Sequence, residues 1–173
     1  MNNEQVIITI YATDRPGIVK ALSDAVLAHK GNWLESSLSR LCGQFAGIVH
    51  ITVPADSKVN LLNEFKQLAD QGIHVTPQDA DVSNEINAHT ESIDIAVEAN
   101  DRAGIVEEIS STLAAANVNV EQMTTTCESA SMAGYELFRA FLRVTLPESY
   151  SVEQLEEALE NVSDDLIASI IEE

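Results

Sequence analysis

Cysteine, basic residues and aromatic residues are all scarce in this chain of 173 residues. Two cysteines, Cys42 and Cys127, are too few for the disulfide framework that stabilises many small secreted domains. The motifs of serine hydrolases, zinc proteases and nucleotide-binding loops are missing. The four histidines lack the spacing of metal ligands and are scattered along the chain: His29, His50, His74 and His89. We therefore expect no catalytic residues, no metal site and no cofactor.

Long hydrophobic runs are also missing. No apolar segment approaches the roughly 20 residues that cross a bilayer, and the first residues lack the basic and apolar segments of a signal peptide. Hydrophobic residues nevertheless make up 45% of the chain, and aromatic residues only 5%. These values predict a core built mainly from Val, Ile, Leu and Ala. We expect a soluble cytoplasmic protein with no membrane partner.

The scarcity of Lys and Arg limits which partners the protein can bind. Nine Lys and Arg face 28 Asp and Glu, which gives a formal net charge of −19. Such a surface repels the phosphate backbone that Lys and Arg normally neutralise, so direct nucleic-acid binding is not expected. Residues 1–86 have a net charge of −4 and residues 87–173 a net charge of −15. The acidic second half is either a solvated surface or a surface that meets a basic partner.

One heptapeptide occurs twice in nearly the same form. Residues 13–19 read TDRPGIV and residues 100–106 read NDRAGIV, so that Asp14 and Asp101 are 87 positions apart. Alternating β-branched residues precede each copy, and apolar residues at helical spacing follow it. Each copy is therefore predicted to form a turn from a strand into a helix. Asp14 or Arg15 is expected near the N-cap, and Pro16 at the first helical position.

The segments that follow repeat as well. Each helix is followed by two strand-like runs, at 33–41 and 45–53 in the first copy and at 120–127 and 135–146 in the second, and then by an amphipathic helix and a short strand. Val59 and Leu27 are expected on the buried faces of their helices, and Ser151 with Gln154 is expected to form a capping box. About six extra residues are predicted within 128–134 of the second copy.

The repeated order β-α-β-β-α-β is the ferredoxin-like pattern. We predict an α+β protein of two ferredoxin-like domains, each a four-stranded antiparallel sheet with two helices on one face. The first domain is expected at 1–80 and the second at 91–173. The polar segment 81–90 is expected to be the linker.

This repeat resembles the ACT domain, a regulatory module that binds amino acids. The resemblance rests on the strand, the Asp-Arg-Pro-Gly turn, the helix and the Asn that opens the second strand, and it covers essentially the whole chain. It implies that a ligand lies between the turn and the start of the second strand, usually at a domain–domain interface. The matching ligand-binding positions are Asp14, Arg15, Gly17 and Asn32 in the first copy and Asp101, Arg102, Gly104 and Asn119 in the second.

Elementary chemistry agrees with a carboxylate ligand at these turns, because free N–H groups and the positive end of a helix attract anions. The alternative is that the turns are only structural, with Asp capping the helix. Ala103 stands where the first copy has Pro16, and the second half is more acidic. We therefore expect the first turn to be the better ligand site.

As a tandem pair of ACT-like repeats without an attached enzyme, the chain resembles the repressors of the glycine cleavage genes. The resemblance implies an amino-acid-responsive regulator with glycine as the effector, which represses by contacting an activator protein rather than DNA. A homodimer is one possible assembly. The alternative function is a detached regulatory subunit of an amino-acid metabolic enzyme.

Overall fold

The computed structural model describes residues 2–80, 92–129 and 136–171, and it divides the chain into two compact units, Met1–Asn84 and Glu85–Glu173. The predicted linker 81–90 and most of the predicted insertion at 128–134 lie outside the described residues. The limits of the two domains therefore stay a prediction. Each unit is described here by itself.

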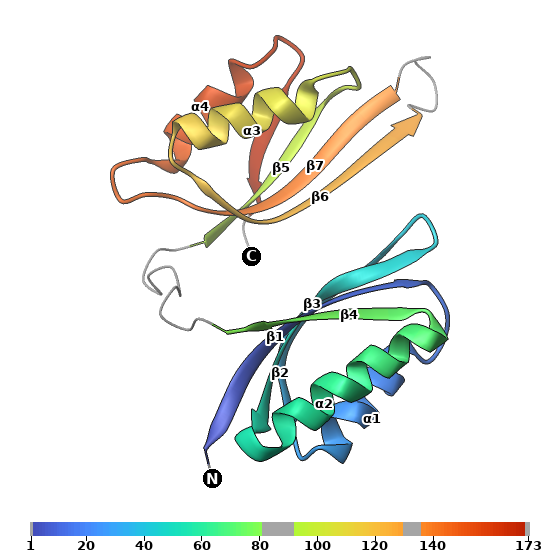
Figure 1. Ribbon diagram of the computed structural model, residues 1–173. Helices are drawn as coiled ribbons and strands as arrows, with labels where there is room; N and C mark the ends of the chain where they lie inside the picture. The colour runs from blue at the N-terminus through green and yellow to red at the C-terminus, as the bar shows by residue number, and fades with distance from the viewer. Residues whose placement is uncertain (1, 81–91, 130–135, 172–173) are drawn as a thin grey trace. The chain divides into compact units, whose positions relative to one another are not determined.

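The first unit is a four-stranded antiparallel sheet in the order β2-β3-β1-β4, with helices on one face (Figure 1). Its central strand β1 pairs with both β3 and β4, which is the ferredoxin-like arrangement. The elements in chain order are β1 (Asn3–Thr13), α1 (Ile18–Ala28), β2 (Asn32–Leu41), β3 (Gln44–Pro54), α2 (Ala55–Gln67), the short 3-10 helix η1 (Leu68–Gln71) and β4 (Ile73–Asp79).

The second unit repeats this arrangement with the strand order β6-β7-β5-β8. Its elements are β5 (Ser92–Asn100), α3 (Ile105–Ala115), β6 (Asn119–Ser129), β7 (Glu136–Thr145), α4 (Val152–Glu160) and β8 (Ile167–Ile171). Equivalent residues are 87 positions apart up to β2 and β6, and 93 apart from β3 and β7 onward. The predicted pair of ferredoxin-like domains is confirmed. The predicted capping box is also present, with Ser151 and Gln154 bonded to each other's backbone N–H groups.

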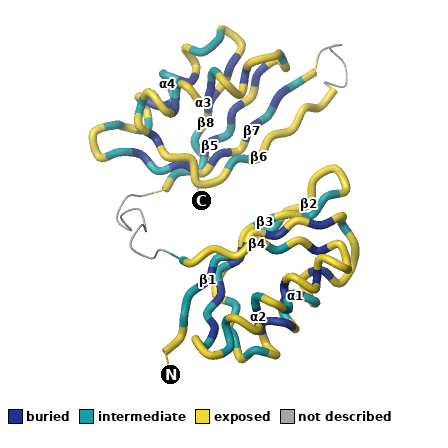
Figure 2. The backbone as a smooth tube through the Cα atoms, viewed as in Figure 1, coloured by how far each residue is buried: buried dark blue, intermediate teal, exposed yellow. Residues whose placement is uncertain are grey.

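Each domain has its own hydrophobic core between sheet and helices, visible as the buried segments in Figure 2. Leu22 on α1 and its equivalent Ile109 on α3 are both fully buried, because one face of each helix repeats its apolar residues at helical spacing. Two sequence-based expectations are wrong here. Leu27 and Val59 are 74% and 66% exposed, since both lie outside the buried stripe of their helices, and Leu61 is buried instead.

The face of each sheet away from the helices differs between the domains. In the first domain this open face carries Tyr11 and Ile48, which are about half exposed, and Tyr11 stacks on His74. In the second domain the half-exposed Phe141 stands at the position of Ile48, and the equivalent strands also carry paired charges. Arg143 donates two hydrogen bonds to Asp94, at 2.8 and 2.5 Å. The backbone is thus repeated, while the chemistry of the open face is repeated only in part.

Within the described residues, no helix is long and apolar enough to cross a membrane.

Candidate functional site

The first Asp-Arg-Pro-Gly turn connects β1 to α1. The backbone N–H of Asp14 donates to the carbonyl of Gly43, at 2.9 Å, which ties the turn to the β2–β3 hairpin. Gly17 is the N-cap of α1 and has a left-handed φ of 96°, a conformation that favours glycine. Helix α1 begins only at Ile18, and no side chain caps it. The predicted N-cap at Asp14 or Arg15 is therefore wrong, and Pro16 precedes the helix instead of opening it.

The uncapped start of α1 has the properties of an anion site. The first bond of the helix runs from Ala21 N–H to Gly17 carbonyl, at 2.9 Å, so the preceding N–H groups have no helical partner. No acidic residue lies in the first turn of α1. A Cβ built on Gly17 would meet no atom within 4 Å, so the backbone of the turn is open. Unsatisfied N–H groups at the positive end of a helix favour a carboxylate.

Both signs of charge lie beside this turn. The Arg15 guanidinium donates to the carbonyl of Gln71 at 2.6 Å, and within residues 2–80, 92–129 and 136–171 it forms no ion pair. The half-buried carboxylate of Asp14 lies 3.6 Å from Arg40 on β2. Arg40 was not expected from the sequence, since only the strand register brings it to Asp14. The turn therefore offers N–H groups and guanidinium groups to an anion, and a carboxylate to a cation.

Asn32 does not join the turn within the first domain. It opens β2, as the sequence predicted, and pairs with Thr52, which in turn pairs with Gln5 on β1. Asp14 comes nine residues after Gln5 along the direction of β1. Nine residues of extended strand span about 30 Å. Asn119 is displaced in the same way, because it pairs with Thr145 opposite Ser92. One domain alone therefore does not bring the turn and the Asn together.

The second turn has the same backbone but different side-chain partners. Asp101 N–H donates to Glu136 carbonyl at 2.8 Å, and Gly104 is a left-handed N-cap with φ of 93°. Where the first domain has Arg40, the second has Cys127, whose thiol donates to Asp101 Oδ1 at 3.5 Å. Burial, followed by the Asp101 carboxylate, raises the pKa of the Cys127 thiol. A raised pKa lowers the fraction of Cys127 that is present as the nucleophilic thiolate at neutral pH.

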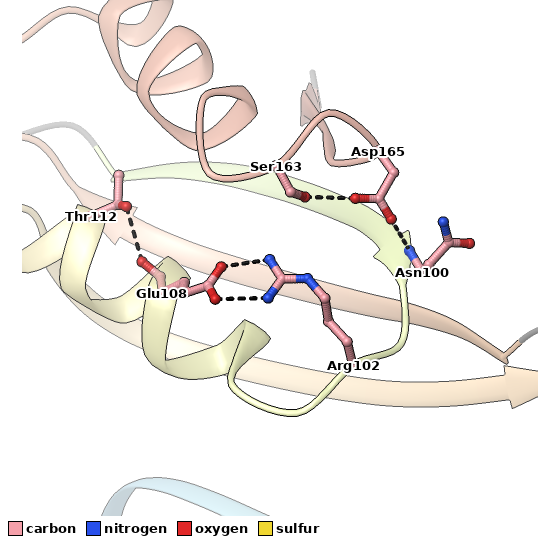
Figure 3. A network of polar contacts seen from close by, with 6 residues as sticks. All are labelled: Asn100, Arg102, Glu108, Thr112, Ser163 and Asp165. Carbon is pink, nitrogen blue, oxygen red and sulfur yellow. Dashed lines mark hydrogen bonds and ion pairs between the residues drawn. The ribbon is translucent and has the colours of Figure 1, made fainter.

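Arg102 is held by a carboxylate of α3, the helix that follows the turn. Its two terminal nitrogens donate to both oxygens of Glu108, at 2.7 and 2.5 Å, as the close-up in Figure 3 shows. The hydrogen bonds from Arg102 lower the pKa of Glu108, and those same bonds raise the pKa of Arg102. Asp165, in the loop before β8, accepts from the N–H of Asn100 at 2.9 Å and also attracts Arg102 electrostatically.

Glu108 and Asp165 were not identified from the sequence. An alignment of the two copies contains the signal, because Glu108 is equivalent to Ala21 and Asp165 to Gly72. Both substitutions add a carboxylate to the surroundings of the second turn.

Shallow hollows lie on the open sheet faces of both domains. One of about 280 Å³ is lined by Ile7, Ile48 and His50, and one of about 260 Å³ by the equivalent Asp94, Phe141 and Arg143. Neither hollow includes a residue of the repeated motif. In the described part of the chain, no three His, Cys, Asp or Glu side chains gather as a metal site.

Comparison with known proteins agrees with this geometry. The ACT domain family model matches residues 4–76. An unknown protein from Galdieria sulphuraria is 24% identical, with 99% of this chain and 100% of that chain covered and a TM-score of 0.79. A "putative glycine cleavage system transcriptional repressor" is 17% identical, with both chains covered completely and a TM-score of 0.72.

No curated protein matches the sequence. The two structural similarities extend over both domains, and the second domain repeats the strand order of the first. The first domain is therefore similar to the ACT domain family, and the second domain repeats its fold.

Proposed function

We propose that the protein is an amino-acid-responsive regulator that represses glycine cleavage genes by contacting an activator protein. The observation that carries this proposal is the first turn, where an uncapped helix start lies beside Arg15 and Asp14. A small zwitterion matches this arrangement. Its carboxylate would bind the N–H groups of α1, and its ammonium group would bind Asp14.

Glycine is the proposed effector because of the fold similarity to the protein named as a glycine cleavage repressor. The open backbone of the turn also allows a small ligand to approach closely, because Gly17 has no Cβ. Asn32 is retained as a proposed contact, but one ACT unit alone cannot supply it together with the turn.

Calorimetric titration with glycine tests this site. We expect the wild type to bind and Asp14→Ala to weaken binding about tenfold or more, because a hydrogen-bonded charge is lost. Asp24→Ala is the matched control, since Asp24 lies on α1, the helix that follows the turn, and among the described residues pairs with the exposed Lys20 and not with the turn. Both variants must retain the melting temperature of the wild type within a few degrees. Equal glycine affinity for Asp14→Ala and wild type would contradict the proposal.

The partner is proposed to be a protein because the charge of −19 opposes direct DNA binding. An electrophoretic mobility shift at physiological salt separates the two possibilities. We expect no shift by the protein alone at sub-micromolar concentration, and a supershift when the activator is bound to its DNA. A shift by the protein alone would refute the mechanism through protein contact. Capture of a metabolic enzyme instead of the activator would favour a detached regulatory subunit.

A further inference from the structure

The two motif arginines have opposite electrostatic surroundings. Arg102 is bound through both terminal nitrogens to the two oxygens of Glu108, and Asp165 adds a second negative charge nearby (Figure 3). In the described part of the chain, Arg15 donates to the neutral carbonyl of Gln71 and to no carboxylate. The difference comes from two replacements, Ala21 by Glu108 and Gly72 by Asp165, on an otherwise repeated backbone.

The carboxylate of Glu108 lies over the start of its own helix. Glu108 is in the first turn of α3, and its backbone N–H donates to Gly104 carbonyl at 3.0 Å. A Cβ built on Gly104 would be 3.9 Å from Glu108 Oε1, whereas a Cβ built on Gly17 would meet nothing within 4 Å. The second turn is therefore covered by an internal carboxylate at the place where the first turn is open.

We propose that Glu108 is a built-in substitute for the carboxylate of a ligand, which keeps the second turn occupied and leaves the first turn as the only responsive site of the pair. This inference rests on the proposed function, because it assumes that the open first turn binds an amino acid. It assigns the two domains different tasks. The first senses the ligand, and the second holds the conformation of an occupied turn without one.

Competition explains why an internal carboxylate prevents binding. A tethered group acts at an effective concentration in the millimolar range or above, and the bidentate geometry with Arg102 is the favourable one for a carboxylate. A free amino acid must displace Glu108 and also approach Asp165, which repels its carboxylate. Removal of Glu108 is expected to free Arg102 for the ligand and to reduce the negative charge around the second turn.

The test is the number of glycine molecules bound per chain, measured by calorimetry on the full chain. We expect one for the wild type, two for Glu108→Ala, and one again for Glu108→Ala combined with Arg102→Ala. Glu107→Ala is the matched control and should bind one, because Glu107 is an adjacent acidic residue that contacts Ser111 and not Arg102. The reciprocal variant Ala21→Glu should lose the site of the first domain, while Ala21→Gln should keep it. Thermal melts verify that every variant is folded.

The outcomes separate this inference from the proposed function. If the wild type and a folded Glu108→Ala both bind one glycine, the inference is wrong and the proposed sensor stands. If the wild type binds none and Glu108→Ala binds one, Glu108 blocks the second turn as inferred, but the first domain is not the sensor. If neither binds glycine, both proposals are wrong.

Discussion

The two domains share one backbone plan and differ in what surrounds it. In the first domain the motif turn is open and the open sheet face is partly apolar, with Tyr11 and Ile48 exposed. In the second domain the turn is covered by Glu108, and the open face carries the Asp94–Arg143 ion pair beside the half-exposed Phe141. A repeated motif therefore fixes the path of the chain, while residues outside the motif decide what each copy can bind.

The separation of the two cores predicts the largest effect. Leu22→Ala and Ile109→Ala remove equivalent, fully buried side chains, and each is expected to destabilise its own domain by about 2–5 kcal/mol. Hydrogen exchange followed by mass spectrometry should report faster exchange in residues 2–80 for the first variant and in 92–171 for the second. The two cores consist of different residues, so the other domain should keep its protection. Equal loss of protection in both domains from either variant would contradict this separation.

A glycine in β3 predicts an effect of intermediate size on the stability of the first domain. A Cβ on Gly47 would lie 2.1 Å from the carbonyl oxygen of Ser37 and 2.8 Å from Leu38 Cα, whereas the equivalent residue of the second domain is the buried Ala140. Gly47→Ala is expected to destabilise the first domain by about 1–3 kcal/mol or more, because backbone atoms must move. The reverse change Ala140→Gly should lower the free energy of unfolding of the second domain by about 1 kcal/mol. It removes a buried methyl group and gives the unfolded backbone more freedom.

Urea unfolding measures both variants. A Gly47→Ala protein with the unfolding midpoint of the wild type would mean that the first sheet can separate β2 from β3 without cost.

The Arg102–Glu108 pair predicts the smallest effect, and one that depends on pH. The pKa of Glu108 is lowered in the folded state, so its stabilisation is present above the unfolded value of about 4.5 and is lost as the pH falls through the folded value. Glu108→Gln should therefore lower the melting temperature slightly at pH 7, and the difference from the wild type should shrink in acid. Glu107→Gln should show no such pH-dependent difference, since Glu107 does not contact Arg102. If the melting temperatures of Glu108→Gln and wild type differ by the same amount from pH 7 to pH 3, the charge of Glu108 is not the cause of the stabilisation.

The sequence was sufficient for the fold because the fold depends on periodic patterns that occur twice. The alternation in β1 and β5 and the helical spacing around Leu22 and Ile109 identify buried faces without any knowledge of contacts. The prediction for Leu27 failed because the sequence does not show whether an apolar residue at the edge of a helical stripe faces the core or the solvent.

The site was less predictable because its contacts cross the sheet. Arg40 reaches Asp14 only through the register of β2 and β3, and Asp165 reaches Asn100 over 65 positions. The cap was also misassigned. Asp14 is a typical capping residue, but the left-handed Gly17 is the N-cap of α1, three residues beyond Asp14.

The pairing of β1 with β4 also has a consequence for synthesis of the protein. Val6 pairs with Asp79, so the first sheet cannot close until the chain has grown past residue 79. Contacts between such distant residues slow folding, but about 90 residues remain to be added at that point. At roughly 5–20 residues per second this takes several seconds. The first domain therefore has time to fold before its acidic copy is complete, and the two similar sequences have little opportunity to exchange strands.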